Sequence, residues 1–147
     1  MTAVATDLHT TAARRLAASG QRYTSSRRAI VEVLVRTQAP MTLPDILSAD
    51  TTLAQSSAYR NLSELIAADV VHRIVTTDEH AHFELAEDLT EHHHHLICSS
   101  CGSVTDFQVP AAVEAELDRA LDQIAERETF AVDHHRLDLV GRCQNCG

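Results

Sequence analysis

Two Cys-x-x-Cys pairs constrain the fold of the last third of this 147-residue chain. The first pair lies in "CSSCG" (Cys98 and Cys101), and the second lies in the closing "CQNCG" (Cys143 and Cys146). A glycine follows each pair and lets the backbone turn tightly beneath the sulfurs. Four thiolates that converge tetrahedrally suit Zn²⁺. We therefore expect one structural zinc site that closes a small C-terminal unit.

A redox function is the rival interpretation of these cysteines. A thioredoxin-like pair needs its first cysteine at the N-terminus of a helix, whereas we expect Cys98 to end a strand. The segment Met1–Thr11 is polar and lacks the apolar core of a signal peptide. No apolar run approaches the ~18 residues of a membrane span. We therefore expect a cytoplasmic protein without a membrane partner, in which cysteines bind metal more often than they form disulfides.

The first part of the chain has the pattern of a winged helix-turn-helix. Gly20 ends a first helical segment. Thr24, Ser25 or Ser26 is placed to cap the second helix, and Thr42 is placed to cap the third. Ser56 or Ser57 is placed to cap a fourth helix. Two alternating strands follow the helices. We expect a first helix at 10–19 and strands at 70–75 and 80–86. Between them we expect a helix that carries the apolar residues of 30–35, a short helix with Leu43, Ile46 and Leu47, and a helix with Tyr59, Leu62, Leu65 and Ile66.

A second unit follows the polar stretch 86–91, which we interpret as a linker. Its expected elements are strands at 93–98, 104–109 and 130–140 and a helix at 110–127, with an apolar stripe of Val113, Leu117, Leu121 and Ile124. The fold class is therefore α+β, with a winged-helix domain at 1–86 and an α/β domain at 87–147. A unit this small with few aromatic residues usually needs a metal or a partner chain for stability.

The charge distribution favours a nucleic-acid partner for the N-terminal part. All 12 basic residues are arginines, and the chain has a net charge of -9. Residues 1–36 hold six arginines against two acids, whereas residues 87–147 hold four arginines against twelve acids. A basic N-terminal part beside an acidic remainder is typical of DNA-binding chains, although short charge runs are also common on solvated surfaces.

Four consecutive histidines precede the first cysteine pair in "EHHHHLICSSCG". Alternate side chains of a strand face opposite ways. His92 and His94 should therefore share one face, and His93 and His95 the other. Further imidazoles and carboxylates are available elsewhere, so the run can supply two separate metal sites rather than a solvated surface. These candidate ligands are His72, His80, His82, Glu84, Glu114, His134 and His135.

These motifs together resemble the Fur superfamily of metal-dependent bacterial repressors, and its zinc-sensing Zur branch in particular. The resembling segments are "SSAYRNLSELIAADVVHR", "FEL", "HHHHLICSSCG", "VDHHRLDLVGRC" and "CQNCG", and the likeness covers nearly the whole chain from about Thr10. The resemblance implies a winged-helix DNA-binding domain, a C-terminal dimerisation domain with a four-cysteine structural zinc, and a sensing site between the two.

The resemblance also implies roles for individual residues. Cys98, Cys101, Cys143 and Cys146 match the structural zinc ligands. The sensing site matches His72, Glu84, His93 and His95, with His82 as a possible ligand. The second site matches His92, His94, Glu114 and His135. Arg22, Ser57, Tyr59 and Arg60 match the DNA-binding positions, and the roles of His80 and His134 stay open.

Two departures from the family pattern bear on the sensed metal. The chain has no cysteine near Glu84, and Pro40-Met41 stand where iron-sensing members often have a histidine. The absence of that histidine and the presence of His72 together favour zinc. We expect a homodimeric repressor that binds double-stranded operator DNA and controls metal homeostasis genes, with regulatory Zn²⁺ or Fe²⁺.

Other functions also remain open. These are an iron-responsive Fur-type regulator, a metalloenzyme that uses the histidines and, as a third class, a metal-storage protein. No nucleophile–base pair is visible, and we expect no catalysis and no small organic substrate.

Overall fold

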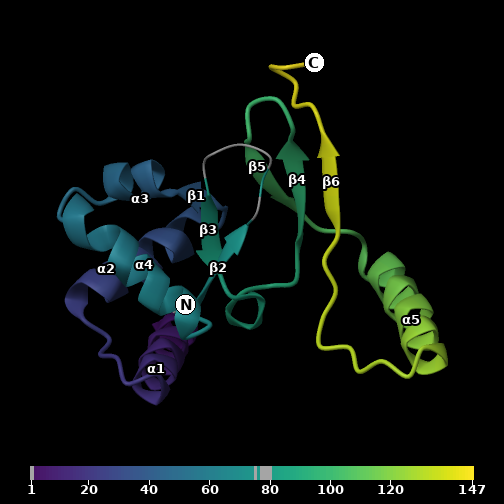
Figure 1. Cartoon of the computed structure of the whole chain (residues 1–147), viewed down its shortest axis with the longest axis horizontal. Coiled ribbons are helices and arrows are strands. Elements are labelled where there is room, and N and C mark those ends of the chain that lie inside the picture. Colours follow the sequence, from purple (N-terminus) through teal and green to yellow (C-terminus); the bar gives the residue numbers. More distant parts are fainter. Residues whose placement is uncertain (1, 75, 77–80) are drawn as a thin grey trace.

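The computed structural model describes residues 2–74, 76 and 81–147 and consists of two parts that lie side by side (Figure 1). His80 lies outside the described residues. The N-terminal part carries four helices and a small sheet, and the C-terminal part carries a second sheet and one long helix. The elements are α1 (Thr2–Ala18), α2 (Ser25–Thr37), β1 (Met41–Thr42), α3 (Leu43–Ala49), α4 (Gln55–Ala67), β2 (Val71–Ile74), β3 (His82–Leu85), η1 (Glu87–Leu89), β4 (His94–Cys98), β5 (Val104–Phe107), α5 (Ala111–Arg127) and β6 (Asp138–Gly141).

Local sequence signals explain where most N-terminal helices begin and end. Thr24 caps α2 by accepting a hydrogen bond from the backbone N–H of Arg27. Thr42 and Asp45 form a reciprocal capping box at the start of α3. Gly20 has a φ of +74°, which suits the turn that follows α1. Of the three candidate caps 24–26, the structure uses Thr24, and the expected cap at Thr42 is confirmed.

The winged helix-turn-helix is confirmed by the packing of the first part. Helices α2, α3 and α4 are accompanied by an antiparallel sheet of order β1-β3-β2, in which β1 precedes α3 and strands β2 and β3 follow α4. Leu16, Ile30, Leu62 and Leu65 are fully buried between the helices, and Phe83 joins the core from β3. Phe83 and Leu85 thus anchor β3 in this core, and Glu84 between them contacts His93 of the second part.

The second sheet places the histidine-bearing strand in its centre. Its order is β5-β4-β6, with β4 antiparallel to β5 and parallel to β6. Residues of both neighbouring strands therefore lie beside the histidines. The α+β class expected from the sequence is thus the observed one.

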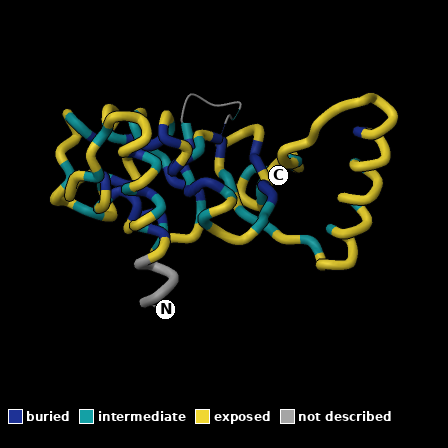
Figure 2. Tube along the Cα trace, turned by 90° about the horizontal axis from the view of Figure 1, so that it is seen from below, coloured by how far each residue is buried: buried dark blue, intermediate teal, exposed yellow. Residues whose placement is uncertain are grey.

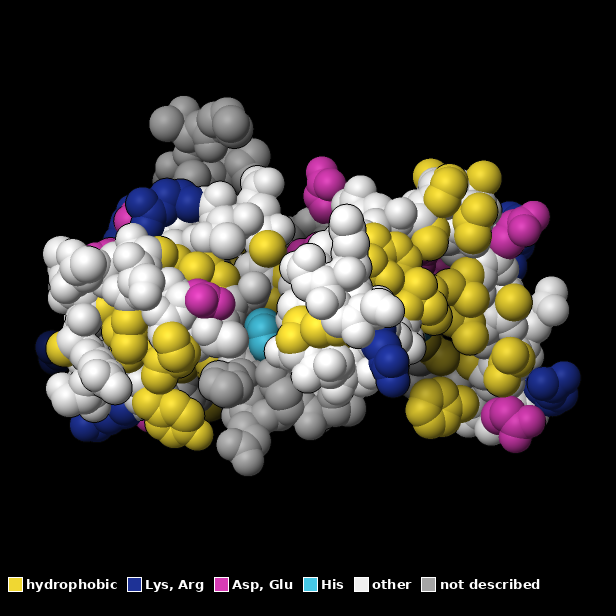
Figure 3. Space-filling model, turned by 90° about the horizontal axis from the view of Figure 1, so that it is seen from above, with side chains coloured by type: hydrophobic (Ala, Val, Ile, Leu, Met, Phe, Trp, Pro, Cys, Tyr) yellow, Lys and Arg dark blue, Asp and Glu magenta, His cyan; other side chains and the backbone are white. Residues whose placement is uncertain are grey.

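The C-terminal part has a thin core, and its long helix stands apart from the sheet. Its buried hydrophobic side chains are Ile97, Cys98 and Ala125. Figure 2 shows α5 and the chain after it as almost entirely exposed. Hydrophobic side chains gather on this end of the molecule in Figure 3. They include Val113, Ile124, Phe130, Leu139 and Val140, whose exposed fractions are 50%, 46%, 69%, 52% and 61%.

Several sequence expectations about single elements were wrong. Residues 130–137 are irregular, and strand β6 begins only at Asp138, where pairing with β4 becomes possible. Helix α4 begins after Ala54, which makes no side-chain cap bond, so neither Ser56 nor Ser57 is the cap. Helix α1 starts earlier than position 10, at Thr2, and its first turns include two alanines, Ala3 and Ala5, of high helix propensity. Strand β1 was not expected, because a strand of two residues is too short to show an alternating pattern in the sequence.

Candidate metal centres and DNA-binding face

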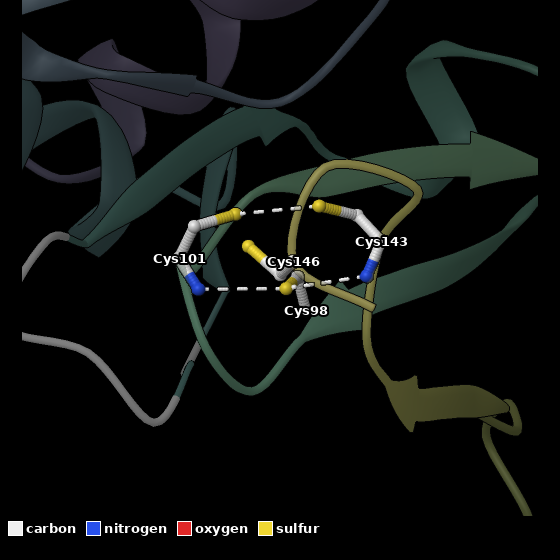
Figure 4. Close-up of side chains that lie close together, drawn as sticks. All are labelled: Cys98, Cys101, Cys143 and Cys146. Carbon is white, nitrogen blue, oxygen red and sulfur yellow. Dashed lines mark hydrogen bonds between the residues drawn. The ribbon is translucent and has the colours of Figure 1, made fainter.

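The four cysteines converge at the end of the second sheet (Figure 4). Their sulfurs lie within 4.8 Å of one another, and the Sγ atoms of Cys101 and Cys143 are 3.8 Å apart. A tetrahedral zinc with Zn–S bonds of about 2.3 Å requires sulfur–sulfur distances of about 3.8 Å. The donor set and its spacing therefore fit one structural Zn²⁺. Cys98 ends strand β4 rather than starting a helix, which argues against the redox interpretation.

Backbone amides support the thiolate form of the first cysteine. The N–H groups of Cys101 and Cys143 each donate to Cys98 Sγ at 3.4 Å. These bonds lower the pKa of the Cys98 thiol to about 6. Because zinc binds the thiolate, a lowered pKa favours metal binding at neutral pH.

A second cluster joins the two parts of the molecule. Glu84 on β3 reaches across to His93, which precedes β4, and to His95 within β4. The Nε2 atoms of these histidines lie 2.7 and 3.0 Å from the two carboxylate oxygens of Glu84. Asp106 on β5 completes the group, with its oxygens 3.7 and 3.6 Å from the same Nε2 atoms.

Asp106 shows that this cluster suits a cation. Its Oδ1 atom is buried and has no hydrogen-bond partner among the described residues. Burial raises the pKa of this carboxyl group, because the ionised form loses its hydration. A divalent ion between the two carboxylates and the two imidazoles would satisfy Oδ1. The donors are oxygen and nitrogen atoms, which suit Zn²⁺, Fe²⁺ and Mn²⁺.

The sequence prediction had not included Asp106. Its position is explained by strand register, because Asp106 lies directly opposite His95 in the β4–β5 pair. The available signal was an acid two residues after Val104 in a short strand close to the histidine run. That signal is weak until the register of the two strands is known.

The structure does not bring His72 into the interdomain cluster. His72 lies opposite Glu84 in the β2–β3 register, but its Nε2 atom is 2.7 Å from Asp69 Oδ1, and 42% of its side chain is exposed. His82 is buried on β3 and also lies outside the cluster.

Each imidazole of the interdomain cluster also has a polar contact at Nδ1, the ring nitrogen that does not face Glu84. His93 Nδ1 lies 2.8 Å from the Glu91 carbonyl oxygen, and His95 Nδ1 lies 3.4 Å from Asp138 Oδ1. An acceptor at Nδ1 fixes the ring and leaves Nε2 free to face the site. These acceptors therefore orient both rings so that Nε2 faces Glu84 and Asp106.

The cluster carries strong mutual electrostatic effects. Hydrogen bonding to Glu84 raises the pKa of His93 to about 9, although burial opposes this. Burial raises the pKa of Glu84, but the hydrogen bonds from His93 and His95 outweigh it and bring that pKa down to about 2. Without metal, Glu84 and His93 form an ion pair at neutral pH.

A third cluster lies within the C-terminal part and centres on Glu114 at the start of α5. The Nε2 atoms of His92, His94 and His135 lie 2.8, 2.8 and 2.6 Å from its carboxylate oxygens. Hydrogen bonds from these histidines, that of His94 foremost, lower the pKa of Glu114 to about 2. His134, in contrast, is exposed and outside all three clusters.

The histidines therefore alternate along the chain between two clusters. His93 and His95 face Glu84, whereas His92 and His94 face Glu114. His92 Nδ1 contacts Glu87. His94 Nδ1 is buried without a hydrogen-bond partner among the described residues. One short segment thus supplies two sites because neighbouring side chains of an extended chain point in opposite directions.

Three of the four residues expected to contact DNA are exposed on the winged-helix fold. Tyr59 on α4 is 63% exposed, and Arg60 beside it is also exposed. Arg22 is exposed in the segment before α2. Ser57 is half-buried, and its hydroxyl donates to the Ala54 carbonyl at 3.4 Å. Helix α4 is the second helix of the helix-turn-helix, which in such folds enters the major groove.

Comparison with known proteins decides the family. The model of the ferric uptake regulator family matches residues 18–140. The chain belongs to this family. The peroxide operon regulator of Bacillus subtilis is 34% identical over 133 residues, which cover 87% of this chain and 86% of that protein. The peroxide-responsive repressor PerR of Staphylococcus aureus is 31% identical, with coverage of 87% and 84%.

Solved structures of family members have the same fold. The ferric uptake regulator of Pseudomonas aeruginosa with manganese has a TM-score of 0.69 at 27% identity and covers 88% of this chain and 95% of its own. A zinc-bound manganese uptake regulator has a TM-score of 0.61 at 26% identity, with coverage of 92% and 98%. The Helicobacter pylori Fur protein, at 23% identity and a TM-score of 0.68, covers 89% of this chain and 85% of its own and supports the fold alone.

Membership of the family assigns a general role. The protein is a metal-responsive transcriptional regulator, since family members are DNA-binding repressors rather than enzymes. Family regulators act as dimers, which is consistent with the exposed apolar side chains of α5 and β6. Within the described residues, no helix is long and apolar enough to cross a bilayer. The zinc-sensing branch, in contrast, has no support from the relatives named above.

Proposed function

We propose that this protein is a homodimeric repressor that binds operator DNA when a divalent metal ion occupies the cluster of Glu84, His93, His95 and Asp106. The observation that supports this is the bridge between Glu84, on the winged-helix part, and the two histidines of the C-terminal part. A metal held by ligands from both parts restricts the angle between them. Two recognition helices can then meet successive major grooves about 34 Å apart. The metal thereby shifts the population toward the DNA-binding state.

The sensed metal follows from the donor atoms. The expectation of zinc rested on the missing histidine near Pro40 and on His72, and His72 contacts Asp69 instead of the cluster. Two imidazoles and two carboxylates form a harder donor set than three imidazoles and one carboxylate would. We therefore favour Fe²⁺ or Mn²⁺ as the regulatory ion, with Zn²⁺ at the four cysteines and Zn²⁺ as the alternative regulatory ion.

A metal titration of DNA binding tests the proposed function. Fluorescence anisotropy measures how tightly the protein binds the DNA upstream of its own gene. Fe²⁺, Mn²⁺ or Zn²⁺ is added in turn, and oxygen is excluded throughout. Glu84→Gln should abolish activation by metal, because it removes the charge that bridges the two parts. His72→Ala is the matched control and should respond as the wild type does. The reverse result would restore His72 as a ligand and the zinc interpretation with it.

The DNA-binding face is tested through the salt dependence of binding. Arg60→Ala should lower the slope of log K against log salt by about one, as expected for the loss of one phosphate contact. Arg119→Ala, which removes an exposed arginine from α5, is the control and should leave the slope unchanged. Equal slopes for both variants would contradict the assignment of α4.

A response to peroxide is a second candidate function. The relatives described above are named as peroxide regulators, and they match this chain over 87% of its length. A nitrogen- and oxygen-ligated ferrous ion can reduce hydrogen peroxide by one electron, whereas Zn²⁺ has no redox chemistry. Peroxide should then abolish DNA binding by the Fe²⁺-loaded protein and leave the Mn²⁺-loaded protein active. Equal loss in both forms would exclude an iron-specific peroxide response.

A further inference from the structure

Arg27 is a buried cation that neither the metal sites nor the assigned DNA contacts use. All 12 arginines lie in the described residues, and Arg27 alone among them is buried, with 7% of its surface exposed. Its neighbour Arg28 is exposed and pairs with Glu32 one turn along α2. Burial of a guanidinium is costly unless hydrogen bonds replace its hydration. The position of this charge therefore requires an explanation.

The hydrogen-bond partners of Arg27 are neutral groups from two different segments. Nη1 donates to the carbonyl oxygen of Arg22 at 2.8 Å and to Gln21 Oε1 at 3.1 Å. Nε donates to Asn61 Oδ1 at 3.1 Å. Gln21 and Arg22 precede α2, whereas Asn61 lies on α4 directly after Arg60. One side chain thus joins the segment before α2 to the helix expected to read DNA.

The segment before α2 is also held on its other side. Tyr23, which follows Arg22, lies with its hydroxyl 2.6 Å from His9 Nδ1 of α1. The backbone of Arg22 is therefore held between two fixed contacts, while its own side chain stays exposed. This arrangement orients an exposed cation without using that cation for the packing.

We infer that Arg27 is a positioning residue for DNA recognition, which fixes the placement of Arg22 relative to Tyr59 and Arg60 on α4. The inference rests on the proposed function, because it takes those three residues to contact operator DNA. Arg27 itself touches no DNA in this account. It holds two DNA-contacting segments at a fixed separation. The free protein is then already arranged to make both sets of contacts, and less conformational freedom is lost when the complex forms.

A guanidinium is needed for this role. Nε and Nη1 project from one rigid plane, and here they donate to groups on two segments. A lysine ammonium is a single flexible donor centre and cannot replace both arms with the same geometry. Arg27→Lys therefore keeps the charge and removes the bridge.

A double-mutant cycle tests the inference. Operator affinity is measured at saturating metal for the wild type, Arg27→Lys, Arg22→Ala and the double variant. Arg27→Lys should weaken binding about tenfold, the size expected for lost hydrogen bonds to a charged group. In the Arg22→Ala background the same change should cost much less, since Arg22 is then absent. Arg28→Lys is the matched control and should bind as the wild type does.

Additional measurements separate positioning from folding. Far-UV circular dichroism and thermal unfolding check that each variant is folded. Asn61→Ala, which removes only the α4 arm, gives a milder test if Arg27→Lys does not fold, and its cost should likewise shrink in the Arg60→Ala background. An equal loss in both backgrounds, or no loss at all, overturns the inference. If Arg22→Ala and Arg60→Ala themselves bind DNA normally, the proposed DNA face is wrong, which is a distinct result.

Discussion

Glu84 Oε2 lies 2.7 Å from His93 Nε2, although Glu84 belongs to the sheet of the winged helix and His93 leads into the second sheet. Before metal binds, this contact is an ion pair between a carboxylate and an imidazolium. The same two groups are candidate ligands of the regulatory metal. Metal and proton therefore compete for His93.

Metal affinity should depend on pH well above the usual range for histidine. The pKa of His93 is raised to about 9, so the ring is protonated at pH 7 and must lose that proton before it binds metal. Affinity of the regulatory site should thus rise between pH 7 and 9 and level off above about 9, with release of roughly one proton per metal at pH 7. Isothermal titration calorimetry in buffers of different ionisation enthalpy measures this release. An affinity that is constant from pH 7 to 9 would contradict it.

Substitution of the four histidines should impair activation by metal in alternating pairs. His93→Ala or His95→Ala removes a ligand from the interdomain cluster, and metal should no longer activate DNA binding. His92→Ala or His94→Ala changes the cluster around Glu114, which lies wholly in the C-terminal part, and should leave partial activation. Metal titrations of operator binding for the four variants compare the two pairs. Equal losses, or pairing of neighbours as 92 with 93, would favour a flexible chelating loop.

Asp106→Asn should have opposite effects on metal binding and on the metal-free protein. The change removes a donor charge, so affinity at the regulatory site should fall by at least about tenfold. The same change removes a buried carboxylate whose ionisation is disfavoured, as its raised pKa indicates. The metal-free variant should therefore unfold at no lower temperature than the wild type. Calorimetric binding and thermal unfolding, both with the cysteine site filled, test the two parts.

Asp138→Asn is the matched control for that variant, because Asp138 lies behind His95 rather than in the cluster. It should weaken metal binding less than Asp106→Asn does. If the two variants lose the same amount of metal affinity, Asp106 supports a ligand, as Asp138 does, and is not itself a ligand.

Removal of one zinc-binding cysteine should unfold the C-terminal part. Cys143→Ser breaks the four-cysteine set in a unit whose buried hydrophobic side chains are Ile97, Cys98 and Ala125. Since so little apolar surface is buried, metal binding supplies most of the folding free energy there. Zinc content, helicity by circular dichroism and dimerisation by sedimentation should all fall. Gln144→Ala, an exposed position in the same turn that removes no sulfur, should change none of them.

The local elements could be predicted from the sequence, because each depends on residues close together in the chain. Thr24 and Thr42 cap helices that begin beside them, and period-two alternation separates His93 from His94. The spacing of the cysteines indicated one shared site for the same reason, since thiolate chemistry and tight turns are local properties. The family resemblance extended these signals to a two-part regulator.

Only the tertiary structure decided which carboxylates accompany the histidines. Asp106 lies in the interdomain cluster because the register of β4 with β5 places it opposite His95. His72 lies opposite Glu84 in the β2–β3 register, but its side chain contacts Asp69 and not the cluster. His135 reaches Glu114 from a segment that was expected to be a strand and is irregular. Strand register and side-chain direction depend on residues far away in the chain, so composition and periodicity do not determine them.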